Sequence, residues 1–548
     1  MKNAKVVIAV VLMVFTAIVA MGYLTFHRSD SRKDVLFDTE NVVNDIRIIS
    51  SGHHSVLHPA GRDSVRAFLC TALSEMGGVP EVLPYGSVPS RFGGTFDIAD
   101  VYCKFEPEGK DTSDSYLMLV AHLDSRFQEQ TPKGVVCSYG AADDGYGLGV
   151  ILELARGALT YSGEWRQGLK ILFTDAEEHE LDGIRCALQQ DNRLFDNVGL
   201  AVNVEARGVK GPALLFEMSA GNARLLDFYK EFATSPYTYS LTSVIYGMMP
   251  NFTDFTYLKP LFPGYNFSVI DNLGYYHNDR DNFSNIHTES LAHYGVQLEP
   301  MVREYLPGSQ YSDTEYFVSE SDKIAHTVPG LGTVCMTKAE NYTFNAAVLA
   351  LFVLAVSGYA AFGRIRLRNV LLSACRLLAA GILAGLLSTA AVYAAARLAG
   401  VPFSFTMTRY LDADWIVAAG CIAVMTVVYL ICFVRKSRRS EDFVYEHLLG
   451  AVLLILVISA LMLVLTGENF YLMFPAVCAL AGLLFHLLMY MNIMSLPALL
   501  LVEMTALPFL YNLYTAVTVG SLGVIVFLAL IYLVIITSLM RCFLIQRR

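Results

Sequence analysis

Acidic and imidazole side chains stand at the ends of three short apolar segments of this 548-residue chain. Carboxylates that share the buried edge of a sheet repel one another and lose their hydration, so a cation must neutralise them. Histidine nitrogens together with carboxylate oxygens form a ligand set that suits zinc with an open coordination position. We therefore predict a metal site where these segments end. The segments and the groups that follow them are Leu117–His122 with Asp124, Leu169–Thr174 with Asp175, Glu177 and Glu178, and Gly199–Val204 with Glu205.

These side chains need a scaffold, and the same stretch of sequence predicts one. The three apolar segments are short and continuous, which is typical of buried strands, whereas Ser64–Met76 and Gly147–Ala158 have the spacing of amphipathic helices. Strands that alternate with helices favour an α/β fold, with a mixed, mostly parallel central sheet flanked by helices. In such sheets the site lies beyond the carboxyl ends of the strands, where the acidic groups stand.

The composition shows that this scaffold is only part of the chain. Hydrophobic residues make up 54% of it and charged residues 16%, with a mean hydropathy of +0.45. These values exclude an ordinary soluble enzyme, a disordered protein and a nucleic-acid binder. The formal charge of −10 is unevenly divided, because residues 1–343 carry 27 Lys and Arg against 43 Asp and Glu, and the remainder carries 13 against 7. The chain therefore joins an acidic part to a basic, apolar part.

The apolar part predicts about eight membrane spans. Val6–Phe26 is long enough to cross about 30 Å of hydrocarbon as a helix, and it follows Lys2 and Lys5. We interpret it as an uncleaved signal anchor, the alternative being a cleaved signal peptide. Seven further apolar runs occupy residues 344–363, 377–396, 415–434, 447–466, 470–490, 495–515 and 519–540.

Basic residues between the spans set the expected topology. With a cytosolic N-terminus, the loops Arg364–Arg376 and Arg435–Arg439 and the tail Arg541–Arg548 are cytosolic too, as the positive-inside rule requires. The intervening domain then lies on the non-cytosolic face, which is the periplasm or exterior of a bacterium or the organelle lumen of a eukaryote. The predicted parts are a cytosolic tip and anchor helix at 1–29, a non-cytosolic domain at 30–335, and a transmembrane domain of about seven helices at 336–548.

Two ionisable residues, His486 and Glu503, lie inside the predicted spans. Burying a charge in a membrane is costly, so a functional role is the first hypothesis for each. The alternative is a protonated Glu503 that is hydrogen-bonded within the bundle or placed near the interface. The sequence contains no repeat, paired carboxylates or Gly/Pro-broken helices that would indicate a transport path.

Between His122 and His277 the sequence resembles the dinuclear zinc aminopeptidases of the MH clan, peptidase family twenty-eight. The likeness is greatest to the membrane-anchored branch, the endoplasmic-reticulum metallopeptidases and vacuolar membrane proteases, which also combine an anchor, an exoplasmic peptidase domain and a multi-span tail. Two departures are Tyr146, where a small residue is usual, and His179–Asp182 after the Glu-Glu pair. The matching motifs are His122-Leu123-Asp124, Gly140 to Gly147, Leu152-Glu153-Leu154-Ala155-Arg156, Glu177-Glu178, Asn203-Val204-Glu205-Ala206 and Tyr276-His277.

The resemblance implies a zinc aminopeptidase-like fold that binds two Zn²⁺ per chain. It assigns His122 and Glu205 to one zinc, and Glu178 and His277 to the other. Asp143 would bridge the two ions, which would share a water.

The resemblance also implies roles for residues around the metals. Asp124 would accept the second N–H of the histidine two residues before it and fix the tautomer. Glu177 would take the proton from the shared water and deliver it to the leaving amine. Tyr276 would hydrogen-bond the tetrahedral oxyanion. We expect Asp144 to be structural and Thr253-Asp254 to shape the pocket wall.

Cysteines and glycosylation sequons leave several questions open. The cysteines of the predicted domain are odd in number, so at least one is free if the others pair. In a eukaryotic secretory compartment some of the sequons could carry glycans. The cysteines are Cys70, Cys103, Cys137, Cys186 and Cys335, and the sequons begin at Asn251, Asn266, Asn282 and Asn341.

These patterns together predict a multi-pass membrane zinc metallopeptidase, most simply an aminopeptidase, whose partners are peptide N-termini and the lipid bilayer, without nucleic acid. A glutaminyl cyclase is the nearest alternative enzyme, because it shares the fold, but such enzymes use one zinc and typically lack the Asp-Asp-Gly-x-Gly form seen at Asp143–Gly147. A catalytically inactive receptor or scaffold is another alternative. A third gives the main role to the C-terminal spans, as a transporter or assembly platform.

Overall fold

The computed structural model describes residues 2–25, 35–131, 134–248, 251–328, 331–403, 414–434, 442–489, 493, 495–516 and 522–544. The chain divides into two compact units, Thr25–Thr327 and a second unit made of Met1–Leu24 with Val328–Arg548. The predicted boundaries at 29 and 335 fall a few residues beyond these divisions. The predicted cytosolic loop Arg435–Arg439 and the last four residues lie outside the described residues.

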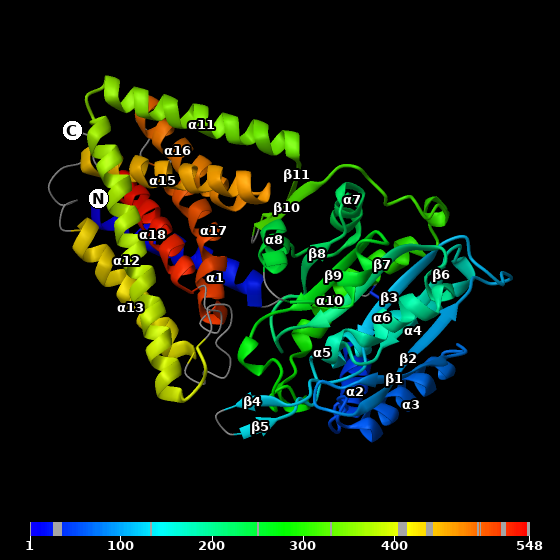
Figure 1. Cartoon of the computed structure of the whole chain (residues 1–548). Coiled ribbons are helices and arrows are strands. Elements are labelled where there is room, and N and C mark those ends of the chain that lie inside the picture. Colours follow the sequence, from blue (N-terminus) through cyan, green and yellow to red (C-terminus); the bar gives the residue numbers. More distant parts are fainter. Residues whose placement is uncertain are drawn as a thin grey trace. The chain divides into compact units, whose positions relative to one another are not determined.

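A seven-stranded sheet forms the centre of the unit Thr25–Thr327, in the order β1-β2-β6-β3-β7-β9-β8 (Figure 1). Strand β3 runs parallel to both β6 and β7, and β7 runs parallel to β9. The antiparallel strands β1, β2 and β8 occupy the edges. This confirms the mixed, mostly parallel α/β sheet. The strand bounds are β1 Glu81–Pro89, β2 Thr95–Phe105, β3 Tyr116–His122, β6 Gly168–Thr174, β7 Val198–Ala206, β8 Leu214–Met218 and β9 Gly264–Val269.

The sheet is buried on both faces, which explains why its central strands are continuously apolar. In β3, Leu117 and Leu119 join the larger core, whereas Met118 and Val120 join a second core on the opposite face. The larger core packs against α2 (Thr39–Ile49), α3 (Pro59–Glu75), α4 (Gly145–Leu159) and α10 (Thr288–Tyr305). The second core packs against α6 (Asp182–Gln190) and α9 (Phe255–Leu258).

Shorter elements complete this unit. The strands β4 and β5 pair as a small antiparallel ribbon. The remaining bounds are β4 Glu129–Thr131, β5 Gly134–Val136, α5 Glu177–Glu180, α7 Ala223–Phe232, α8 Ser240–Met248 and β10 Lys323–Val328.

In its described residues the second unit is helical apart from the short strand β11. Five of its described helices are long and apolar enough to cross a membrane, namely α11, α12, α15, α16 and α18. Shorter apolar helices at Ala4–Ala20, Ala419–Phe433 and Ser495–Ala506 occupy the three other predicted spans. The bounds are α1 Lys2–Thr25, β11 Gly332–Thr337, α11 Lys338–Ala361, α12 Leu367–Ala399, α13 Asp414–Tyr429, a π-helix at Leu430–Val434, α15 Asp442–Thr466, α16 Phe470–Met489, α17 Ser495–Ala516 and α18 Leu522–Leu544.

Amide side chains form a polar cluster among the helices of this unit. Asn469 donates hydrogen bonds to Asn345 Oδ1 at 2.6 Å and to Ser459 Oγ at 2.9 Å, and it accepts one from Asn341 at 3.2 Å. The cluster therefore joins α11, α15 and the start of α16.

Of the ionisable residues expected in the spans, His486 lies 2.9 Å from the hydroxyl of Tyr445.

Glu503 is buried in α17, and its Oε2 has no hydrogen-bond partner among the described residues.

Two of the four sequon asparagines, Asn266 and Asn341, are fully buried, so the folded chain does not present them as glycan acceptors. Four of the five cysteines of the predicted domain are free thiols, namely Cys70, Cys103, Cys137 and Cys186.

Asp175, at the end of β6, forms a buried ion pair with two arginines of α3. Its carboxylate accepts hydrogen bonds from Arg62 Nη1 at 2.8 and 2.7 Å and from Arg66 Nη2 at 2.5 Å. The side chain thus points toward α3 and takes no part in the expected metal cluster. The pair anchors the chain directly before Glu177.

Replacing Arg62 with Ala is expected to destabilise the protein by about 3–5 kcal/mol, because it leaves a buried carboxylate with half of its partners. Thermal melts of the detergent-solubilised chain measure the change. The control Arg193→Ala removes an exposed arginine and should leave the melting temperature unaltered. Equal melting temperatures for wild type and Arg62→Ala would contradict an anchoring role.

Candidate metal centre

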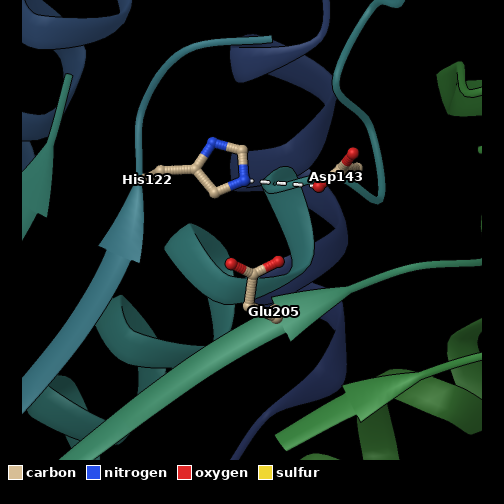
Figure 2. A group of neighbouring side chains, drawn as sticks. All are labelled: His122, Asp143 and Glu205. Atoms are coloured by element: carbon tan, nitrogen blue, oxygen red, sulfur yellow. Dashed lines mark hydrogen bonds and ion pairs between the residues drawn. The ribbon is translucent and has the colours of Figure 1, made fainter. Parts of the chain in front are cut away.

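Five buried side chains converge at the carboxyl edge of the sheet. The first group contains the last residue of β3, His122, with Asp143 and Glu205, and one ligand atom of each lies within 4.8 Å of the others. His122 Nε2 is 3.3 Å from Asp143 Oδ1, and Glu205 points toward both from the end of β7 (Figure 2).

The second group consists of Asp143, Glu178 and His277, again with one ligand atom of each within 4.8 Å of the others. His277 Nε2 lies 3.0 Å from Glu178 Oε1 and 3.3 Å from Asp143 Oδ2. Asp143 therefore belongs to both groups, and its two oxygens face different histidines. The structure brings together all five residues that the sequence resemblance names as ligands.

The electrostatics of this cluster fit a bound cation. Asp143 Oδ2 and Glu178 Oε1 are buried and both face His277 Nε2, a single nitrogen that can donate at most one hydrogen. Burial and the charge of Glu178 raise the pKa of Asp143 to about 7, and burial raises the pKa of Glu205 to about 7. Burial also acts on Glu178, but His277 and Arg126 hold its pKa below the ordinary value. A bound metal ion would stabilise the ionised form of these buried, closely spaced carboxylates.

The tautomer of His122 follows from its second nitrogen. Nδ1 lies 2.8 Å from the main-chain carbonyl of Asp124, which only accepts hydrogen bonds. Nδ1 therefore carries the hydrogen, and Nε2 presents its lone pair to the cluster.

The carboxylate of Asp124 lies between the His122 ring and the backbone that follows β6. Its nearest oxygen is 3.5 Å from His122 Nδ1, farther than the carbonyl of the same residue. The carboxylate also accepts hydrogen bonds from the backbone N–H groups of Glu177, at 2.9 Å, and Glu178, at 3.3 Å. Asp124 thus fixes the acidic pair that follows β6.

The expected base and oxyanion donor border the cluster. Glu177 begins α5, remains partly exposed, and has a pKa that burial raises well above the ordinary value. It belongs to neither ligand group. Tyr276 stacks on the His277 ring with centroids 3.5 Å apart.

Hydrogen bonds fix three further residues for which the sequence suggested structural roles. Asp144 caps α4 by accepting the N–H of Gly147 at 2.9 Å, and it also accepts the N–H of His122 at 3.2 Å. Asp254 is buried and accepts a hydrogen bond from Thr174, whereas Thr253 accepts one from Asn266 at 2.9 Å.

Asp281 was not identified from the sequence, although it holds the ligand loop. It accepts the backbone N–H groups of Ala142, at 2.7 Å, and Asp143, at 3.3 Å, and the hydroxyl of Ser138 at 2.9 Å. Burial and the charge of Asp143 raise its pKa to about 7. Its only sequence signal is its place four residues after His277, which does not separate it from the exposed Asp279.

Arg126 is a second residue that the sequence did not reveal. Its Nη1 donates to the carboxylate of Glu178 at 3.1 Å and to the main-chain carbonyl of the same residue at 3.0 Å. The guanidinium therefore holds one oxygen of this glutamate while the other faces His277.

Residues 100–301, which contain every one of these groups, match the Peptidase family M28. Endoplasmic reticulum metallopeptidase 1 of Homo sapiens is 28% identical over 224 residues, which are 39% of this chain and 24% of that protein. The Vacuolar membrane protease of Paracoccidioides brasiliensis (strain Pb03) is 30% identical over 189 residues, or 34% of this chain and 18% of that protein. The matched part of the chain thus spans about a quarter or less of the length of these relatives.

Solved structures resemble about half of the chain. A Zn-dependent exopeptidase from Parabacteroides distasonis has a TM-score of 0.40 at 18% identity, covering 48% of this chain and 98% of that one. Glutaminyl cyclase from Porphyromonas gingivalis has a TM-score of 0.39 at 17% identity, covering 49% of this chain and 99% of that one.

The substitution Asp281→Asn is expected to weaken zinc binding by about 10- to 100-fold, because the amide cannot accept the two loop N–H groups and the serine hydroxyl as a carboxylate does. Competition with a chromogenic chelator measures the affinity. Asp279→Asn, on the same loop but exposed, is the matched control and should bind zinc as the wild type does. Unchanged affinity in Asp281→Asn would show that the loop keeps its position without this carboxylate.

Proposed function

Since residues 100–301 match the Peptidase family M28, we propose that this chain is a membrane-bound zinc aminopeptidase that removes residues from peptide N-termini. The observation that supports this proposal best is the pair of three-residue groups that share Asp143. One carboxylate with an oxygen toward each group suits a site for two ions.

In this proposal His122 and Glu205 would hold one zinc, Glu178 and His277 would hold the other, and Asp143 would be a ligand common to both. When bound, zinc polarises the scissile carbonyl and lowers the pKa of a coordinated water. The chain positions these side chains, because Asp124 and Asp281 hold the two loops from which the proposed ligands Glu178 and Asp143 project.

Two other side chains would carry out the proton and charge chemistry. Glu177 would accept a proton from the attacking water and pass it to the leaving amine, a role that suits its raised pKa and its partial exposure beside the ligands. Tyr276 would donate a hydrogen bond to the oxyanion that forms at the scissile carbon. Its stacking on His277 fixes the ring beside the site.

We further propose that the peptidase domain faces the non-cytosolic side of the membrane. The five long apolar helices and the basic residues between the predicted spans support this topology. The substrates would then be peptides or proteins of that compartment.

Glu177→Gln is expected to lower the hydrolysis of leucine p-nitroanilide by about 10²- to 10⁴-fold, because the amide cannot accept the proton from water. The measurement uses the zinc-loaded, detergent-solubilised chain, and zinc content should stay at the wild-type value. Glu180→Gln, exposed on the same short helix, is the control and should retain activity. Full activity of the Glu177→Gln protein would contradict the proposed role of Glu177 as the general base.

Metal analysis is expected to give two zinc ions per wild-type chain and fewer in His122→Ala or His277→Ala, since each change removes one ligand from a different group. A content near zero in the folded wild-type protein would favour the inactive scaffold instead. A content of one ion, together with cyclisation of a peptide that begins with glutamine, would favour a glutaminyl cyclase.

A further inference from the structure

Arg207 lies on the metal side of the sheet, directly after β7. Its backbone N–H donates to the carbonyl of Val269 at 2.9 Å, so the chain is still paired with β9 at this point. Because side chains alternate along a strand, Arg207 projects to the same face as Glu205, two residues earlier. The guanidinium carbon is 5.9 Å from the centre of the Tyr276 ring. Arg207 therefore borders the proposed catalytic centre.

The contacts of Arg207 leave much of its hydrogen-bonding capacity unused. Its Nη2 donates to two neutral groups, the hydroxyl of Tyr246 at 3.2 Å and the carbonyl of Phe252 at 3.1 Å. Its Nε is buried and has no acceptor among the described residues. These contacts hold the side chain in place without neutralising its charge.

Other buried or partly buried arginines of this domain form ion pairs. Arg62 and Arg66 bind Asp175, Arg126 binds Glu178, and Arg156 binds Asp45 at 2.7 Å. Among the described residues, Arg207 has no carboxylate oxygen within 4.0 Å, and the charges of Glu205 and Glu177 act on it only from beyond that distance. A partly buried guanidinium that has no directly bonded anion is a candidate binding site for one.

We propose that Arg207 binds a carboxylate of the peptide substrate next to the scissile bond. The proposal rests on the aminopeptidase function above. A guanidinium fork with free donors matches the geometry of a carboxylate, and charge-assisted hydrogen bonds in a shielded site are strong. The carboxylate has two possible sources, the free C-terminus of a dipeptide or the side chain of an acidic residue. Arg207 would thus make the enzyme selective for very short or acidic substrates.

Binding measurements on the zinc-loaded full chain test this proposal without turnover, in a Glu177→Gln background. Isothermal titration calorimetry compares Leu-Ala with Leu-Ala amide for the C-terminal source, and Glu-Ala amide with Gln-Ala amide for the side-chain source. At least one acid is expected to bind about tenfold or more tightly than its neutral partner. The pair that shows the difference identifies the source of the carboxylate.

Substitutions at Arg207 then test whether this residue causes the preference. Arg207→Gln is expected to bring the ratio of acid to neutral affinity to about one, and Arg207→Lys to lower it at least threefold, because lysine keeps the charge but loses the fork. Arg193→Gln, an exposed arginine elsewhere, should keep the wild-type ratio. The lysine variant decides the matter if the glutamine variant does not fold.

Two results would overturn the inference. One is equal binding of acid and neutral ligands by the chain that retains Arg207, and the other is a preference that persists in both Arg207 variants. Hydrolysis of Leu-Ala amide by the chain with Glu177 intact tests the proposed function separately. Failure of that reaction would remove the aminopeptidase proposal, whereas the affinity ratios report on Arg207 alone.

Discussion

The repulsion among Asp143, Glu178 and Glu205 is the constraint on which the rest of this domain depends. Three carboxylates meet at one buried edge of the sheet, one from the loop before α4, one from α5 and one from the end of β7. Burying each of these charges without a counter-ion is unfavourable. The fold holds them together through other acidic side chains. Asp124 and Asp281 accept hydrogen bonds from backbone N–H groups of the loops that contain Glu178 and Asp143. One set of acidic residues therefore repels within the cluster, and another set holds the loops of the cluster in place.

The sequence was informative wherever a property is local. The strands β3, β6 and β7 were predicted because sheets covered on both faces require continuous apolar runs, and the spans because hydrocarbon requires long ones. Asp281 could not be found in this way, since its role depends on backbone N–H groups more than 130 positions away. For the same reason the sequence wrongly grouped Asp175 with the residues of the metal site. The two arginines that pair with it belong to α3, far away in the sequence.

The helical unit shows a similar limit. A search for ionisable residues in the spans singles out His486 and Glu503, yet the polar contacts that join three helices are made by Asn341, Asn345 and Asn469. Amides are less conspicuous than charges in a hydropathy profile. In a membrane they matter for packing, because an unpaired amide has no water to replace its partner.

The order of the ligands along the chain bears on how the protein is made. The group formed by His122, Asp143 and Glu205 is complete once the ribosome has released β7, but the other group lacks a member until His277 has followed β9. The two groups share Asp143, yet the second cannot form until the chain has been synthesised past His277, near the end of the unit Thr25–Thr327. The order of synthesis therefore makes the two halves of the cluster form one after the other.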